Sequence, residues 1–174
     1  MPQFILDMGS PEGARTFGTL DSFARGYLEA AFFTETNEMY DSAEWESEQA
    51  QDDIREGRCG GDIPRDSSVA ELAPESLASA IADCAAFQSA NAELLELAYA
   101  RDYEPEQAGR KFWFTRNGHG VGYWDRPQLD YRHAAETVES LKSRDTLGDK
   151  LSAAARNAGS RELYRGDDGQ IYFS

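Results

Sequence analysis

The side chains best suited to chemistry lie between two aromatic runs in the C-terminal half of the chain. Arg116, Asn117, His119 and Asp125 are the candidate functional residues of this stretch. An imidazole titrates near neutral pH, so His119 could act as a general base while the Asp125 carboxylate orients it. Asn117-Gly118 is a favoured two-residue turn, and the alternating aromatic residues around it predict a β-hairpin with these side chains at its tip.

The same residues also fit a purely structural role, because one histidine without a partner motif is weak support for catalysis. The chain contains no Gly-x-Ser-x-Gly nucleophile motif and no phosphate-binding glycine loop. His119 and His133 have no partners at metal-ligand spacing, and Cys59 and Cys84 lack the further ligands that zinc needs. We therefore expect no metal and no cofactor, and a binding protein is favoured over an enzyme. A small enzyme or ligand-binding protein with its site at the Arg116–His119 hairpin is the alternative.

Acidic residues dominate the composition. The 174 residues include 32 acidic and 17 basic side chains, which gives a formal net charge of −15. Residues 35–75 hold 13 acids and 3 bases, whereas residues 110–174 hold 9 acids and 11 bases. A surface this negative disfavours direct binding to nucleic acid or to an anionic membrane. It could instead imitate the phosphate charge of DNA and occupy the basic channel of a DNA-binding enzyme.

A solvated loop whose charge favours solubility is the other interpretation of the acidic segment. Residues 35–70 hold Met39, Tyr40 and Trp45 among 11 acids and are predicted to be irregular, apart from a short helix within 42–56. The carboxylates that we assign to partner binding are Glu44, Glu46, Glu48, Asp52, Asp53 and Glu56.

The hydrophobic pattern predicts an α+β fold in a single domain over residues 1–174. Apolar residues at helical spacing predict a helix over 22–34 and one long helix over 75–99, which Pro74 begins. This long helix is expected to pack on a small antiparallel sheet built from two C-terminal hairpins, the second of them turning at Asp168-Gly169. Further expected elements are an edge strand over 3–6, an insertion over 127–145 with a helix at 133–142, and a helix from Leu147 that ends at Gly159.

One string of this chain resembles a motif of small acidic proteins encoded by bacteriophages and mobile elements: Phe112-Trp-Phe-Thr-Arg-Asn-Gly-His-Gly-Val-Gly-Tyr-Trp-Asp-Arg126. The resemblance extends to residues 20–34, 74–87 and 163–172, about half of the chain. It implies no catalytic residues. It implies an accessory product that acts inside a bacterium, a setting in which small acidic proteins often antagonise host defence.

These observations lead to one functional hypothesis. The chain binds and inhibits a host complex that handles nucleic acid, of the restriction or CRISPR type, partly through DNA-like acidity. No apolar run approaches the ~20 residues that span a bilayer. The first residues also lack the basic and apolar regions of a secretory signal. We therefore expect a protein of the bacterial cytoplasm that contacts neither membrane nor nucleic acid directly.

Overall fold

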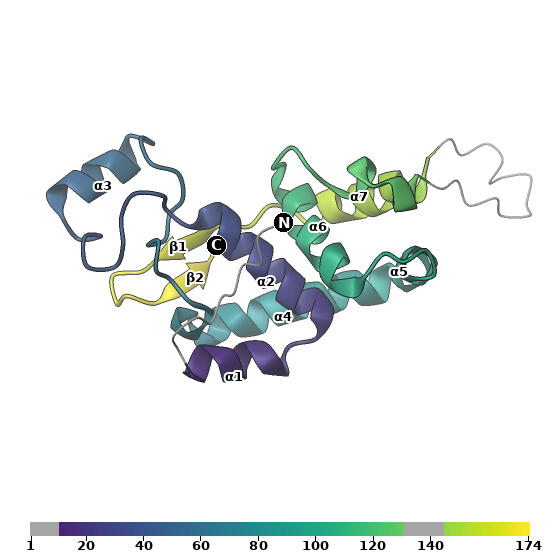
Figure 1. Cartoon of the computed structure of the whole chain (residues 1–174), viewed down its shortest axis with the longest axis horizontal. Helices are drawn as coiled ribbons and strands as arrows, with labels where there is room; N and C mark the ends of the chain where they lie inside the picture. The colour runs from purple at the N-terminus through teal and green to yellow at the C-terminus, as the bar shows by residue number, and fades with distance from the viewer. Residues whose placement is uncertain (1–10, 131–144) are drawn as a thin grey trace, which may run out of the picture. The chain divides into compact units, whose positions relative to one another are not determined.

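The computed structural model describes residues 11–130 and 145–174, which form seven α-helices, three short 3-10 helices and one two-stranded antiparallel sheet (Figure 1). The α-helices are α1 (Pro11–Thr19), α2 (Ser22–Glu35), α3 (Glu48–Arg55), α4 (Pro74–Ala90), α5 (Ala92–Tyr99), α6 (Pro105–Asn117) and α7 (Leu147–Asn157). The 3-10 helices are η1 (Val69–Glu71), η2 (Tyr123–Asp125) and η3 (Pro127–Leu129), and the strands are β1 (Leu163–Arg165) and β2 (Ile171–Phe173). The predicted mixture of helices with a small antiparallel sheet is confirmed, and helix dominates.

The first predicted hairpin is wrong, because its residues belong to α6 and η2. Pro105 occupies the first turn of α6, and Gly118 ends the helix in the left-handed conformation with φ of 70°. The aromatic run from Phe112 to Phe114 is buried on every side of the helix. Residues 111–116 are all buried, so this part of the helix shows no single apolar stripe, and its sequence was open to interpretation as alternating strand.

The predicted long helix begins where expected but is divided in two. Pro74 starts α4, and Asn91 separates α4 from α5. Asn91 Nδ2 donates a hydrogen bond of 2.9 Å to the Phe87 carbonyl oxygen. Asparagine readily bonds the nearby backbone in this way, which disfavours it in helix interiors. The predicted strand over 3–6 and the helix over 133–142 lie outside the described residues.

The chain forms two compact units that are each assembled from distant segments. We call the first the acidic unit; it comprises Leu28–Ile81 and Arg161–Ser174 together with the residues up to Asp21. We call the second the aromatic unit; it comprises Ser22–Tyr27 and Ala82–Ser160. Helices α2 and α4 therefore contribute residues to both units.

The C-terminal hairpin organises the acidic unit. β1 and β2 pair Leu163 with Phe173 and turn through Gly169, whose φ is 80°, so the predicted second hairpin is confirmed. The hairpin is joined to the start of α4, because the Phe173 amide donates to Ser76 Oγ at 3.1 Å. An isolated parallel bridge between Leu72 and Ile171 extends this contact along β2.

Aromatic rings build the core of the other unit. Phe112 of α6 stacks on Phe87 of α4 with ring centroids 4.1 Å apart. Helices α2 and α6 cross at closely approaching glycines. A Cβ atom on Gly109 would lie 1.9 Å from the Phe23 carbonyl oxygen, and one on Gly26 would lie 2.0 Å from the Glu106 carbonyl oxygen. Glycine is therefore required at both positions of this crossing.

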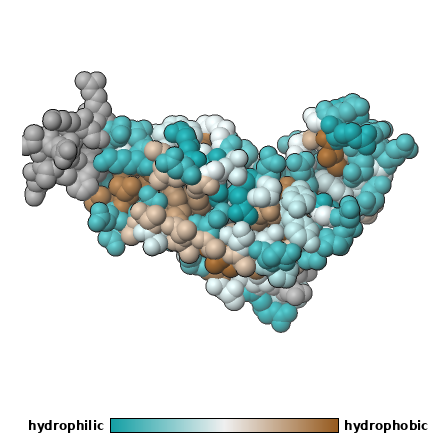
Figure 2. All heavy atoms as spheres, turned by 180° about the vertical axis from the view of Figure 1, so that it is seen from behind, coloured by the Kyte–Doolittle hydropathy of each residue, from teal (hydrophilic) through white to brown (hydrophobic). Residues whose placement is uncertain are grey.

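Figure 2 colours the surface by hydropathy, and brown atoms mark its most hydrophobic residues. Large hydrophobic side chains also reach the surface; among the described residues these are Phe33, Met39, Ile81, Val121, Trp124 and Tyr164.

Candidate functional site

The acidic segment was predicted to be irregular apart from a short helix within 42–56. The helix is present as α3, and the rest of the segment is folded around it. Ser47 caps this helix, with its Oγ accepting a hydrogen bond from the Ala50 amide at 3.2 Å. Trp45 and Ala50, which belong to this segment, are buried. The segment has few large apolar residues for a core. Hydrogen bonds between its polar side chains help to hold it together.

Asp53 is the centre of those polar contacts. Tyr40 Oη donates to its Oδ2 at 2.5 Å, while Gln49 Nε2 and Arg58 Nε donate to its Oδ1 at 2.9 and 2.6 Å. The hydrogen bond from Tyr40, followed by that from Arg58, lowers the pKa of Asp53. The same bond raises the pKa of Tyr40 to about 12. Asp53 thus holds the segment together and is buried, so its carboxylate is not part of the exposed acidic surface.

The segment is also joined to the C-terminal hairpin. Asp66 Oδ1 accepts hydrogen bonds from both the amide and the hydroxyl of Ser42, at 2.7 and 2.8 Å. Arg165 Nη1 of β1 donates to the same hydroxyl at 3.2 Å. These contacts connect the start of the acidic segment to residues far away in sequence and so fix its path.

Five of the six predicted partner-binding carboxylates remain outside this buried network. Glu44, Glu46 and Glu48 are exposed, on the approach to α3 and in its first turn. Asp52 pairs with Arg55 at 2.8 Å, and Glu56 pairs with the same Arg58 that contacts Asp53. Three exposed carboxylates therefore lie close together in sequence on a folded support.

The net charge of the protein belongs almost entirely to one unit. The acidic unit contains 20 acidic and 6 basic side chains, and the aromatic unit contains 12 and 11. Their formal net charges are −14 and −1. The acidic segment and the C-terminal strands thus contribute to one strongly negative body.

Arg116, the first residue of the predicted functional hairpin, is a buried structural residue of α6. Its Nε and Nη2 donate to the carbonyl oxygens of Gly159 and Ala158 at 2.6 and 3.0 Å. Its Nη1 donates to Tyr27 Oη and to Asp83 Oδ2, both at 2.9 Å. The guanidinium therefore caps the carbonyl end of α7 and joins it to α2 and α4.

The other residues of that prediction lie at the end of α6 and beyond it. Asn117 is the last residue of the helix, and the His119 amide donates to the Phe114 carbonyl oxygen at 3.1 Å. Much of the His119 side chain is exposed, and burial of the remainder lowers the pKa of its imidazole. Asp125, the expected orienting carboxylate, forms ion pairs with Lys111 and Arg126 at 3.4 and 3.2 Å. The geometry thus assigns Asp125 to charge pairing with these two cations.

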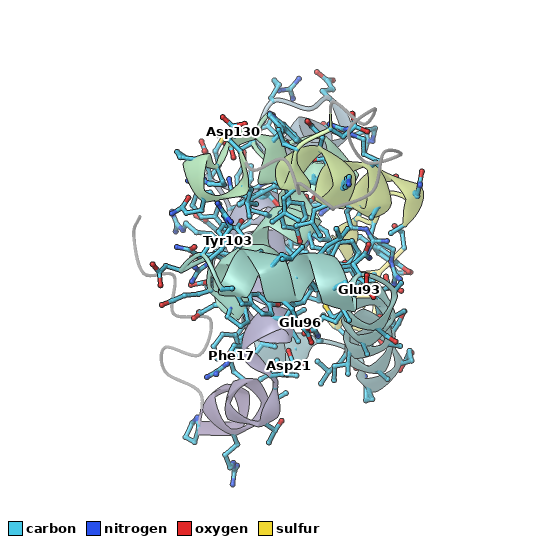
Figure 3. The ribbon with its side chains drawn as sticks, turned by 90° about the vertical axis from the view of Figure 1, so that its right-hand side faces the viewer. Phe17, Asp21, Glu93, Glu96, Tyr103 and Asp130 are labelled. Atoms are coloured by element: carbon cyan, nitrogen blue, oxygen red, sulfur yellow. The ribbon has the colours of Figure 1, made fainter. Side chains whose placement is uncertain are left out.

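Lys111 is a buried charge that the sequence patterns missed. Its side chain on α6 is 4% exposed, and Nζ lies 5.6 Å from the Phe114 ring centroid as well as near Asp125. Burial, with a smaller contribution from Arg126, lowers its pKa. Tyr103, labelled in Figure 3, is buried in the same unit, and burial raises its pKa. Pro105 was a local signal for the start of this helix, but no local pattern indicates that Lys111 is buried in it.

Several kinds of site are not formed by the residues that the structure describes. No group of three or more His, Cys, Asp or Glu side chains among them converges as a metal site. Cys59 and Cys84 are both buried, and neither is part of a disulfide. Within residues 11–130 and 145–174, none of the helices combines the length and the apolar character that a membrane span requires.

Comparison of the chain with models of protein families, with curated proteins and with solved structures found no match.

Proposed function

We propose that this chain is an interaction protein whose acidic unit binds the basic, nucleic-acid-binding surface of another complex and inhibits it. The concentration of charge carries the proposal: −14 in one unit against −1 in the other. A surface of one sign steers a partner of the opposite sign and raises the association rate. Duplex DNA offers such partners one negative charge per ~1.7 Å, and exposed carboxylates imitate that charge.

The folded state of the acidic segment supports the same proposal. Glu44, Glu46 and Glu48 lie on a segment that the Asp53 network and the Asp66–Ser42 contacts hold in place. A surface that is already ordered loses less conformational entropy on binding than a flexible loop does. The proposed partner class is a host defence complex of the restriction or CRISPR type. That choice rests on the resemblance to phage and mobile-element proteins and is part of the proposal.

A competition experiment tests this function. Purified restriction and CRISPR effector complexes are mixed with labelled duplex DNA, and the protein is titrated in at low and high salt. We expect it to displace DNA from at least one complex and to lose affinity as salt rises. Displacement by none of the complexes at either salt concentration would contradict the proposal.

A matched pair of variants separates the acidic segment from net charge alone. The test variant carries Glu44→Gln, Glu46→Gln and Glu48→Gln. The control carries Glu93→Gln, Glu96→Gln and Glu104→Gln, exposed positions of the aromatic unit of which the first two are labelled in Figure 3.

Both triple variants remove three negative charges, so they differ only in where the charge is lost. At about 0.5 kcal/mol for each exposed charge, the test variant should compete roughly tenfold less well, and the control should not change. Equal weakening by both would assign the effect to net charge and would contradict a defined binding surface.

The geometry favours no second function at Arg116–His119. The Arg116 guanidinium is engaged by four groups of its own unit, and Asp125 is paired with two cations.

A further inference from the structure

The C-terminal hairpin has one buried face and one exposed face. Side chains alternate between the two faces of a strand, and Tyr164 of β1 lies directly opposite Tyr172 of β2. On the other face, Leu163, Ile171 and Phe173 are buried. Tyr164 is 45% exposed and Tyr172 is partly exposed, so the outer face of the hairpin presents two aromatic rings.

The two rings form one platform, which we call the tyrosine pair. Their centroids lie 5.7 Å apart at an interplanar angle of 23°. Tyr172 Oη donates to Asp168 Oδ2 at 2.7 Å, and a Cβ atom on Gly166 would lie 2.8 Å from the Tyr172 ring. The turn thus fixes the Tyr172 ring, and the cross-strand stack fixes Tyr164 against it. A surface held in this way loses little conformational entropy on binding.

Negative charge lies beside the tyrosine pair. Asp167 and Asp168 are exposed in the turn of the hairpin, and Glu75 is exposed in the first turn of α4. The hydrogen bond to Asp168 raises the pKa of Tyr172 to about 12, and the charge of Glu75 makes a smaller contribution. The carboxylates of Asp168 and Glu75 are therefore both close to the Tyr172 side chain.

The two arginines of the hairpin segment make contacts elsewhere. Arg161 lies over the Phe173 ring, 5.3 Å from its centroid, and donates to Ser79 Oγ at 3.0 Å. Arg165 donates to Ser42 Oγ of the acidic segment at 3.2 Å. These contacts draw both cations to groups outside the tyrosine pair, and the charges that border the pair are those of the carboxylates.

A guanidinium group is the cation that matches these surroundings best. The face of an aromatic ring attracts a cation, and a neighbouring carboxylate adds an ion pair. The planar guanidinium of arginine stacks on rings, is weakly hydrated and pairs with carboxylates through two N–H groups. The ammonium group of lysine is a compact and strongly hydrated charge, so it gains less from the same platform.

We propose that the tyrosine pair and Asp168 form the docking site for an arginine side chain on the basic surface of the protein partner. Electrostatic attraction mainly accelerates association, whereas buried aromatic and arginine side chains supply most of the binding free energy of an interface. The exposed carboxylates of the acidic segment provide the attraction, and the tyrosine pair provides the anchor. Arg165 and Ser42 connect the hairpin to that segment.

The choice of partner rests on the function proposed above, which this inference extends by naming the side chain that is recognised. A peptide experiment tests the recognition without any defence complex. The full-length, isotope-labelled protein is titrated with a peptide in which glycine and arginine alternate, and then with the matched peptide of glycine and lysine, both followed by amide NMR. We expect saturable shifts at residues 162–174 with the arginine peptide. The lysine peptide, which has the same charge, should bind there about threefold or more weakly.

Variants at position 164 separate the aromatic ring from its apolar character. Tyr164→Leu removes the ring but keeps an apolar side chain, whereas Tyr164→Phe keeps the ring. We expect the first to weaken binding of the arginine peptide by about threefold or more and the second to leave it unchanged. Trp124→Leu removes an exposed ring of the aromatic unit and should also leave it unchanged. Unchanged amide spectra away from the substituted position show that the variants are folded.

Three results would overturn this inference. The first is equal affinity of the arginine and lysine peptides. The second is equal affinity of Tyr164→Leu and Tyr164→Phe for the arginine peptide, and the third is the confinement of all shifts to residues outside the hairpin. None of them concerns DNA. Failure to displace DNA from any complex would contradict the proposed function alone, and the arginine site would then serve a different basic partner.

Discussion

The two units of this protein differ in where their charged side chains lie. The acidic unit carries a net charge of −14 and exposes Glu44, Glu46 and Glu48. The aromatic unit is nearly balanced, yet it buries the two cations Lys111 and Arg116. The difference shows that the net charge of a unit does not indicate whether its charged side chains are buried and part of its core. Exposed carboxylates stay hydrated and give the acidic unit its surface, whereas Arg116 is satisfied inside the protein and joins helices.

The cores of the two units explain this contrast. In the aromatic unit, the guanidinium of Arg116 lies against two rings, with its carbon atom 4.9 Å from the Phe112 ring centroid and 5.9 Å from that of Tyr27. The acidic segment has few large apolar residues, and its own buried charge, Asp53, is surrounded by hydrogen-bond donors. Five variants, two of them controls, and a pH titration test this comparison.

Removal of Arg116 should have the largest effect. Arg116→Ala leaves the Asp83 carboxylate without this ion pair and the carbonyl oxygens of Ala158 and Gly159 without their donor. We expect the free energy of unfolding to fall by about 3 kcal/mol, as measured by urea denaturation. Arg110→Ala removes a less buried ion pair with Glu106 and should change stability by no more than about 0.5 kcal/mol. Equal losses from the two variants would remove the distinction between buried and surface charge.

The crossing of α2 and α6 should give the next largest effect. Gly109→Ala places a methyl group against the Phe23 backbone, which cannot move like a flexible side chain, so we expect a loss of about 1–3 kcal/mol in thermal or urea unfolding. Gly18→Ala in α1 of the acidic unit meets no atom within 4 Å and should be neutral or stabilising by up to ~1 kcal/mol. A neutral Gly109→Ala would show that this close crossing is not needed.

The pH dependence of the acidic unit should give the smallest effect. The pKa of Asp53 is lowered, chiefly by the hydrogen bond from Tyr40, so its contribution to stability is complete above the ordinary value of 3.8 and is lost as pH falls through the lowered pKa. The pKa of Tyr40 is raised to about 12, so its contribution is complete below 10 and is lost as pH rises through about 12.

Tyr40→Phe separates this network from the other carboxylates of the chain. It removes the hydroxyl that lowers the pKa of Asp53, so the loss of stability below 3.8 should become shallower, as measured by urea unfolding at a series of pH values. An unchanged acid profile in Tyr40→Phe would mean that the contact does not contribute.

Local residues were sufficient to predict several elements of the fold. Helical spacing predicted α2, Pro74 predicted the start of α4, and Asp168-Gly169 predicted the C-terminal hairpin. Thr146 and Gly159 bound α7, where the helix from Leu147 was expected. Each of these signals acts through the conformation or hydrogen bonding of neighbouring residues, so no knowledge of the distant chain was needed.

The stretch around Asn117-Gly118 shows where local signals fail. The glycine adopts the left-handed conformation that a hairpin turn requires, but here it ends α6. The left-handed glycine suits both structures, and the burial of Phe112, Trp113 and Phe114 decides between them. The candidate functional roles of Arg116 and Asp125 depended on the hairpin. Because the hairpin is absent, the structure instead gives Arg116 contacts to α7, α2 and α4 and gives Asp125 two ion pairs.

The sequence by itself determined the charge of the protein, its helix starts and its C-terminal turn, because these depend on composition or on neighbours along the chain. Only the tertiary structure decided which charges are buried. Arg116 meets Tyr27, which is 89 residues away, and Ser42 meets Arg165, which is 123 residues away. A residue is buried by the segments that pack around it, and when those segments are distant in sequence no local pattern can report its burial.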